Sequence, residues 1–132
     1  RLIEIDNLMF CIFNGDTVQT VKNIDLLYSS GINSIQILKT IIKWTLNIKI
    51  ASDLYKSGES IDKAINYTTP YIFWKIRPKF ERSIKLCKYL DLNIIIERLL
   101  SLEERIKSHP NADTTLLSYS ILGIANLVKN ND

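Results

Sequence analysis

The chain has 132 residues, of which 46% are hydrophobic, and a formal net charge of +3. This length corresponds to one domain that buries about two-thirds of its unfolded surface, so folding requires neither a metal nor disulfides. The charge is too mild for a protein that binds polyanions over its whole surface, and most of the excess falls between residues 71 and 88, so a negatively charged partner would bind locally.

Every periodic segment of the sequence favours a helix, and none favours a strand. The first predicted helix ends at Asn14-Gly15, a dipeptide typical of a helix C-terminus. The second begins after the capping residue Asp16 and ends at Gly31. Its inward side is expected to consist of Val21, Ile24, Leu27 and Tyr28.

The third predicted helix, from Asn33 or Ser34 to Gly58, carries two apolar stripes on opposite sides. One stripe consists of Ile35, Leu38, Ile42 and Leu46, and the other of Ile37, Ile41, Trp44, Ile48, Ala51 and Tyr55. Such a helix is buried between neighbours, or is buried on one side and docked to a partner on the other. We expect it to be among the most buried helices, and an exposed stripe would mark a partner surface.

The next two predicted helices flank the most basic stretch of the chain. A short helix follows the capping residue Ser60 and ends near Tyr67. Because Pro78 fits the first turn of a helix, the main helix is expected to begin there, with residues 71–76 in a turn or a short helical piece. The inward stripe of that helix is Phe80, Ile84 and Cys87.

Two long helices complete the predicted fold. Asp91 caps a helix with an i, i+4 pair of Glu103 and Lys107, and the last helix runs from Asp113 to about Val128. Gly123, with Ser120 nearby, indicates a close helix crossing. The inward residues are Leu92, Ile95, Leu99, Leu102 and Ile106 on the first helix and Leu117, Ile121, Ile124 and Val128 on the second. The predicted fold is therefore all-α, a single compact bundle of six to seven helices spanning residues 1–132.

Little in the sequence supports catalysis. His109 lies in a Ser-His-Pro loop without an acid or thiol at helical spacing, and no Gly-rich phosphate loop or catalytic motif occurs. The adjacent Glu103 and Glu104 point about 100° apart, so they do not form a carboxylate pair. Cys11 and Cys87 are far apart and outside any C-x-x-C pair, which favours free thiols over a disulfide or a zinc site. We expect no active site, no metal, no cofactor and no nucleotide binding.

Charged residues interrupt the apolar run between residues 35 and 54, which argues against a membrane span. A cytoplasmic location is expected because no signal peptide is visible. The chain begins with Arg1 rather than Met and enters an apolar pattern at once, so we expect it to be the C-terminal or an internal part of a longer protein.

The stretch "YIFWKIRPKFERSIKLCK", residues 71–88, places aromatic residues among bases with Glu81 as the only acid. Phe80, with Phe73 or Trp74, is expected to anchor this stretch to the core, while a basic face points outward. That face would contact DNA phosphates or an acidic patch on another subunit, or would only be solvated. The candidate contact residues are Lys75, Arg77, Lys79, Arg82, Lys85 and Lys88. A helix-turn-helix would require Pro70 to open the second helix, because the turn is otherwise too long.

Three segments carry a resemblance to a known family. They are "NGDTVQTVKNIDLLYSSGINSIQILKTI", "TTPYIFWKIRPKFERSIKLC" and "LSLEERIKS". With these segments in this order, the chain resembles the C-terminal domain of the delta subunit of bacterial DNA polymerase III. The resemblance covers residues Ile5 to Val128. The pattern Pro70, Phe73, Lys75, Pro78, Phe80 is the most distinctive part. The chain departs from the family at Val21, where a small Ala is common, and in the short link at residues 108–110.

The resemblance implies a role in assembly rather than a reaction. In that family the C-terminal helical domain joins those of the delta-prime and gamma/tau subunits in the circular collar of the clamp loader. An N-terminal ATPase-like module, here missing, binds the sliding clamp that the complex loads onto DNA. The domain would be a non-catalytic part of the polymerase III holoenzyme in DNA replication. The alternative is a stand-alone helical domain that binds nucleic acid through the basic stretch.

Overall fold

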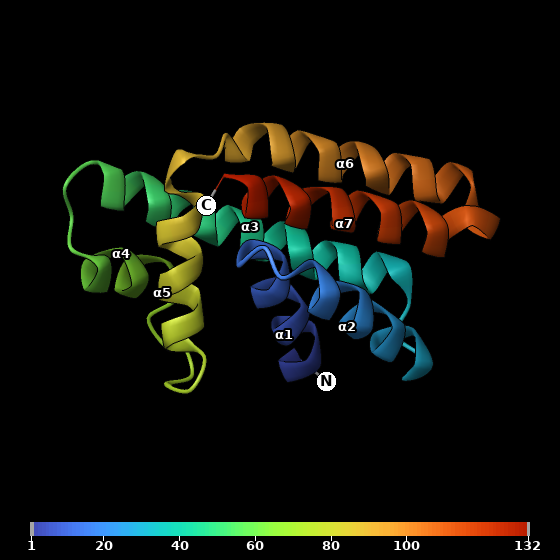
Figure 1. Ribbon diagram of the computed structural model, residues 1–132, viewed down its shortest axis with the longest axis horizontal. Coiled ribbons are helices and arrows are strands. Elements are labelled where there is room, and N and C mark those ends of the chain that lie inside the picture. The colour runs from blue at the N-terminus through green and yellow to red at the C-terminus, as the bar shows by residue number, and fades with distance from the viewer. Residues whose placement is uncertain (1, 132) are drawn as a thin grey trace.

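The computed structural model describes residues 2–131, with side chains from Ile5 onward, and there the chain forms seven α-helices, two short 3-10 helices and no strand (Figure 1). The predicted all-α class with six to seven helices is confirmed. The α-helices are α1 (Leu2–Phe13), α2 (Thr17–Ser29), α3 (Ser34–Lys56), α4 (Ile61–Thr68), α5 (Arg77–Leu86), α6 (Leu92–Ser108) and α7 (Asp113–Asn130), and the 3-10 helices are η1 (Cys87–Tyr89) and η2 (Pro110–Ala112).

Four helices begin where the sequence places a capping residue. The side chains of Asp16, Asn33, Ser60 and Asp91 each accept a hydrogen bond from a backbone N–H in the first turn of α2, α3, α4 and α6. Each bond satisfies one of the N–H groups that a helix start leaves without a partner. The helix α5 begins instead with Pro78 in its first turn, where a missing N–H costs nothing.

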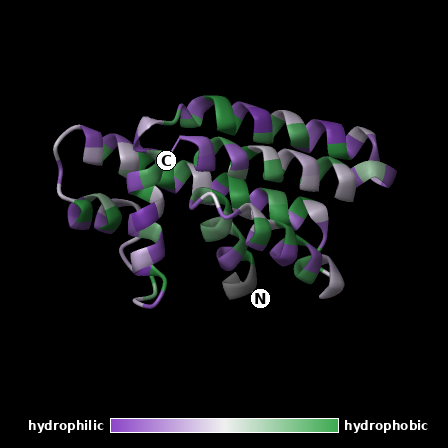
Figure 2. Cartoon of the chain, in the orientation of Figure 1, coloured by the Kyte–Doolittle hydropathy of each residue, from purple (hydrophilic) through white to green (hydrophobic). Residues whose placement is uncertain are grey.

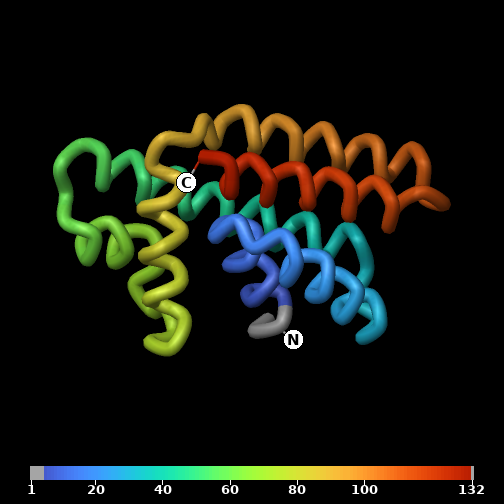
Figure 3. Tube along the Cα trace, in the orientation of Figure 1, coloured from blue at the N-terminus to red at the C-terminus, as the bar shows by residue number. Residues whose placement is uncertain are grey.

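The helix α3 is the centre of the fold. It packs against α1, α4, α5, α6 and α7. Figure 3 shows α6 and α7 running side by side in opposite directions, the hairpin of α1 and α2 on one side of α3, and α4 with α5 near its C-terminal end. The predicted burial of α3 follows from this position, because neighbours cover it on most sides.

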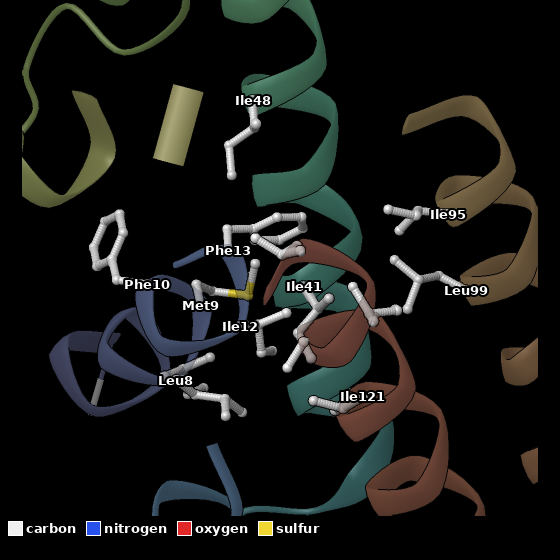
Figure 4. Packing of buried hydrophobic residues seen from close by; sticks show 14 of the residues in the cluster. Leu8, Met9, Phe10, Ile12, Phe13, Ile41, Ile48, Ile95, Leu99 and Ile121 are labelled. Carbon is white, nitrogen blue, oxygen red and sulfur yellow. The ribbon is translucent and has the colours of Figure 1, made fainter. Parts of the chain in front are cut away.

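The core forms where α1, α3, α6 and α7 meet (Figure 4). Phe13 of α1, Ile41 of α3, Leu99 of α6 and Ile121 of α7 are all fully buried. The whole predicted seam of α6 is buried, as are the four predicted inward residues of α7. Apolar side chains at helical spacing thus supply one continuous core.

The two stripes of α3 differ in burial. Of the second stripe Ile37, Ile41, Ile48 and Ala51 are buried, and Trp44 and Tyr55 are half-buried. In the first stripe Leu38 is buried and Ile35 and Ile42 are half-buried, whereas Leu46 is 43% exposed. The outward part of the first stripe continues to Ile50, which is also 43% exposed.

On α2 the predicted inward position of Val21 is wrong. Val21 is 43% exposed, and Thr20 is buried in its place together with Ile24 and Leu27. The hydroxyl of Thr20 donates to the carbonyl oxygen of Asp16 at 2.7 Å, so this polar side chain is satisfied inside the core. Thr20, Ile24 and Leu27 follow the i, i+4, i+7 spacing of one helix face, which leaves Val21 at its edge.

The predicted close helix crossing at Gly123 is also wrong. A Cβ atom added at Gly123 would have no atom within 4 Å, and the residue is exposed. The close approach is at Gly15 instead, where an added Cβ would lie 2.8 Å from the Cα of Lys129 in α7. Gly15 also has a φ of +71°, which favours glycine. This turn therefore requires glycine both for its backbone conformation and for its close contact with α7.

Replacing Gly123 by Ala should therefore stabilise the protein by about 0.5–1 kcal/mol, because Ala costs less conformational entropy in a helix and meets no neighbour here. Chemical denaturation of the wild type and of Gly123→Ala measures the difference. A loss of stability would mean that Gly123 is in contact with another part of the molecule.

Candidate functional site

The segment from α4 through α5 is anchored to the core by three aromatic rings in edge-to-face contact. Phe80 is fully buried, and its ring centroid lies 5.3 Å from that of Trp44 in an edge-on arrangement. Trp44 lies 5.4 Å from Phe10 in the same way. The Trp44 indole N–H also donates to the Asp6 carboxylate at 2.8 Å. Side chains of α1, α3 and α5 are thereby joined, and the predicted anchoring role of Phe80 is confirmed.

Asp6 lies beside the ring of Trp44 and is half-buried. Burial raises the pKa of the Asp6 carboxyl, and the Trp44 hydrogen bond and the nearby Lys43 offset that effect only in part. The carboxylate is therefore held by its indole partner inside a partly dehydrated site.

The predicted anchoring by Phe73 or Trp74 is wrong. Phe73 is 48% exposed and Trp74 is 71% exposed, while Ile72 and Ile76 pack against the core instead. The N–H groups of Ile76 and Arg77 both donate to the carbonyl oxygen of Phe73, at 3.0 and 3.1 Å. In this turn Ile72 and Ile76 pack inward, whereas Phe73 and Trp74 remain largely exposed.

Four exposed aromatic side chains consequently gather around residues 67–76, which we call the aromatic loop. Tyr67 is 75% exposed and Tyr71 is 98% exposed, and the ring centroids of Phe73 and Trp74 lie 5.9 Å apart. Figure 2 shows hydrophobic and hydrophilic residues next to each other in this loop, where it projects beyond the first turn of α5. Exposed aromatic clusters of this kind are typical of binding surfaces.

Beside the aromatic loop lies a groove of about 480 Å³ between the loop and α3. Trp44, Thr40, Lys43 and Asn47 line it from α3, and Asp6 lines it from α1. On the loop side it is lined by residues 68–73 and Ile76. The groove combines an indole ring with hydroxyl, amide and ammonium groups, so it offers both a stacking surface and hydrogen-bonding groups.

The six basic candidate residues do not form one uniform face. Arg77 is bound to α4, with its guanidinium 2.8 Å from the Asp62 carboxylate and 3.5 Å from the Asn66 side-chain oxygen. The ammonium of Lys88 lies over the rings of Tyr55 and Tyr89, at 5.2 and 5.4 Å from their centroids. Both residues thus hold elements of this chain together.

The other four bases are exposed. Lys75 lies over the Trp74 ring, 5.4 Å from its centroid, and Lys85 pairs with Glu81 at 3.3 Å. Lys79 and Arg82 form no ion pair with another residue whose side chain the structure describes. The predicted outward face on α5 is confirmed for Lys79, Arg82 and Lys85, which lie opposite the buried Phe80 and Ile84.

A second surface with exposed apolar groups lies on α7. Tyr119 is 82% exposed and stands between two grooves, one of about 530 Å³ against α2 and one of about 410 Å³ against α6. Leu122 lines both grooves as well, and we call Tyr119 and Leu122 the α7 ridge. Val21, which the sequence placed inward, lines the groove against α2.

The groups that carry catalysis or bind metals are dispersed. Among the side chains described from Ile5 onward, no three of His, Cys, Asp or Glu gather at a spacing that would hold a metal ion. Cys11 and Cys87 are free thiols, and burial raises the pKa of Cys87 to about 12. His109 is exposed at the end of α6, with its Nδ1 3.2 Å from the Arg105 carbonyl oxygen. No helix in the described part of the chain is both long enough and apolar enough to cross a membrane.

Sequence reasoning missed the exposed aromatic loop and the groove beside it. Residues 71–76 form turns rather than a helix, so no periodic spacing in the sequence distinguished the inward Ile72 and Ile76 from the exposed aromatic residues. The groove had no signal in the sequence, because it forms between segments that are distant along the chain.

Comparison with known proteins identifies no related protein. No family model matches the chain, and no curated protein or solved structure shows significant similarity to it.

Proposed function

We propose that this chain is the collar-type C-terminal domain of a bacterial clamp-loader delta subunit, which assembles with gamma/tau and delta-prime subunits in the cytoplasm and has no catalytic role of its own. The resemblance of the three sequence segments suggests the family. Agreement between the predicted and observed helix boundaries supports the proposal, because an assembly domain of that type is all-α. The sliding clamp would be reached through an N-terminal module of the same protein.

The observation that carries the proposal is the α7 ridge. Tyr119 is 82% exposed and lines two grooves together with Leu122, and apolar groups gathered beside grooves are typical of interaction surfaces. Further large apolar residues are exposed on the neighbouring helices α2 and α6 and on α7 itself: Val18, Leu26, Ile94, Leu100 and Leu127. A helical module with apolar side chains on several outward surfaces suits a subunit with neighbours on more than one side.

The test is binding of this chain to gamma/tau and delta-prime subunits encoded in the same genome, measured by pull-down and titration. Replacing Tyr119 by Lys should weaken binding at least about tenfold, because Tyr anchors dominate interface energetics. Tyr67→Lys is the matched control, since Tyr67 is 75% exposed on α4, outside the α7 ridge. Unchanged binding by the Tyr119 variant would remove the ridge from the interface, and no binding by the wild type would refute the assembly role.

A second candidate function is nucleic-acid binding through the exposed face of α5. It is favoured by Lys79 and Arg82, which point into solvent without an ion-pair partner among the described side chains. Phosphate contacts by such residues are independent of sequence and weaken with salt.

If α5 contacts phosphates, replacing Lys79, Arg82 and Lys85 together by Gln should flatten the log-log salt dependence of DNA binding by roughly 2 units. The melting temperature should change little, because all three side chains are exposed. Fluorescence anisotropy with a labelled oligonucleotide at several salt concentrations measures the slope. An unchanged slope and affinity would show that this face does not contact phosphates.

A further inference from the structure

The aromatic loop is fixed in place while its aromatic side chains remain in solvent. Ile72 and Ile76 hold it to the core, and Arg77 ties its end to Asp62 of α4 at 2.8 Å. Backbone hydrogen bonds from Ile72 to Thr69 and from Ile76 to Phe73 close its two turns. The exposed rings are therefore carried on an ordered support, and a ligand that used them would pay little to order the loop.

The rings and charges around the loop suit a flat, negatively charged ligand. Tyr71 and Trp74 present aromatic surfaces that are 98% and 71% exposed. The cations at this site are Lys75, which lies over one face of the Trp74 ring, and Lys43 in the groove. Lys43 lies near Asp6, the one carboxylate lining the groove, which also accepts a hydrogen bond from Trp44. In single-stranded nucleic acids the unpaired nucleobases stack on aromatic side chains, and the phosphates between them contact cationic side chains such as lysine.

We propose that the aromatic loop binds single-stranded nucleic acid, with unpaired bases stacked on Tyr71 and Trp74 and the phosphates beside Lys75 and Lys43. The inference rests on nucleic-acid binding as the second candidate function and adds a stacking site to the phosphate contacts of α5. Lys79, one turn along from Lys75, would continue the path of the strand onto α5. The amide of Asn47 and the hydroxyl of Thr40 supply hydrogen-bonding groups in the groove.

Charge and ring type favour a nucleic acid over other occupants. An apolar protein segment would bury the ammonium group of Lys75, which forms no ion pair with a described side chain, without supplying a counter-charge, and this burial is costly. Three of the four exposed aromatic residues are Tyr or Trp, whose polar groups suit a hydrated strand, and cations beside the rings match a polyanion. An anionic membrane surface shares part of this chemistry, so vesicles form one arm of the test.

The experiment measures binding of the chain to a fluorescein-labelled oligothymidine of about twenty nucleotides by anisotropy. The double variant Tyr71→Ala, Trp74→Ala should lose about tenfold or more in affinity, because each stacked base contributes measurably to binding. Its salt dependence should stay unchanged, since no phosphate contact is removed. Tyr119→Ala, on the distant α7, is the matched control and should bind as the wild type does.

Two further ligands separate stacking from charge attraction. An abasic strand of the same length keeps the phosphates and should bind about tenfold or more weaker than oligothymidine, and a duplex of that length should not compete better than the single strand. The conservative variant Trp74→Phe should retain most of the affinity. The other tryptophan, Trp44, lines the groove, so this variant should lose only the part of the strand-induced fluorescence quenching that comes from Trp74.

Several results would overturn the inference. Equal affinity for the abasic strand, or no loss in the double variant, would leave phosphate binding by α5 in place and remove the stacking site. Binding to phosphatidylserine vesicles without binding to oligothymidine would assign the loop to a membrane surface. Absence of any nucleic-acid binding by the wild type would refute both the stacking site and the second candidate function, and the proposed role in the collar would be untouched.

Discussion

Replacing Leu99 by Ala should lower the free energy of unfolding by about 2–5 kcal/mol. Leu99 is fully buried in the seam of α6, which packs against α3 and α7. Truncation removes apolar contacts and leaves a cavity between three helices that cannot all move inward. Urea denaturation followed by circular dichroism measures the loss.

The neighbouring Leu100 supplies the matched control, because it is 50% exposed on the same helix. Leu100→Ala removes the same atoms and has the same helix propensity, so it should cost less than about 1 kcal/mol. Similar losses for the two variants would mean that the seam of α6 is not the core of the protein in solution.

Replacing Gly15 by Ala should cost about 2–4 kcal/mol, for two reasons that add together. A non-glycine residue at a φ of +71° is strained, and the new Cβ would lie 2.8 Å from the Cα of Lys129. Because the close atom belongs to the backbone of α7, the turn at Gly15 and the end of α7 would have to move apart. Thermal and chemical denaturation would both register this loss.

Gly31 separates the two reasons. It has a φ of +84°, yet an added Cβ would meet no atom within 4 Å. Gly31→Ala should therefore cost only the backbone strain, about 1–2 kcal/mol. Equal losses at Gly15 and Gly31 would show that the turn after α1 does not pack closely against α7.

Much of the fold could be predicted because its signals are local. A capping side chain such as Asp91 bonds to N–H groups two and three residues ahead, and the seam from Leu92 to Ile106 repeats with the helix period. Both depend only on residues within a few turns. The helix starts and the cores of α6 and α7 therefore follow from the sequence.

The wrong predictions concern residues whose surroundings are set by distant segments. Thr20 rather than Val21 is buried on α2 because α1 and α7 determine which side of that helix is covered, while the Thr20 hydroxyl is satisfied locally by the Asp16 carbonyl oxygen. Gly123 meets nothing, whereas Gly15 meets Lys129, more than a hundred positions along the chain. Sequence spacing identifies a glycine in a helix, but only the packing of helices tells which glycine lies at a close contact.

The candidate site shows the same division. The buried position of Phe80 and the outward direction of Lys79, Arg82 and Lys85 follow from the period of α5. The pairing of Arg77 with Asp62 links two helices and could not be read from spacing. The exposure of Trp74 likewise depends on which neighbours in the loop took the inward positions, here Ile72 and Ile76.

Native mass spectrometry of this chain mixed with gamma/tau and delta-prime subunits from the same genome tests the proposed collar role most directly. The proposal predicts a complex that contains this chain together with both partners, and loss of that complex in the Tyr119→Lys variant while Tyr67→Lys retains it. A wild-type chain that remains separate from both partners at micromolar concentrations would contradict the proposal.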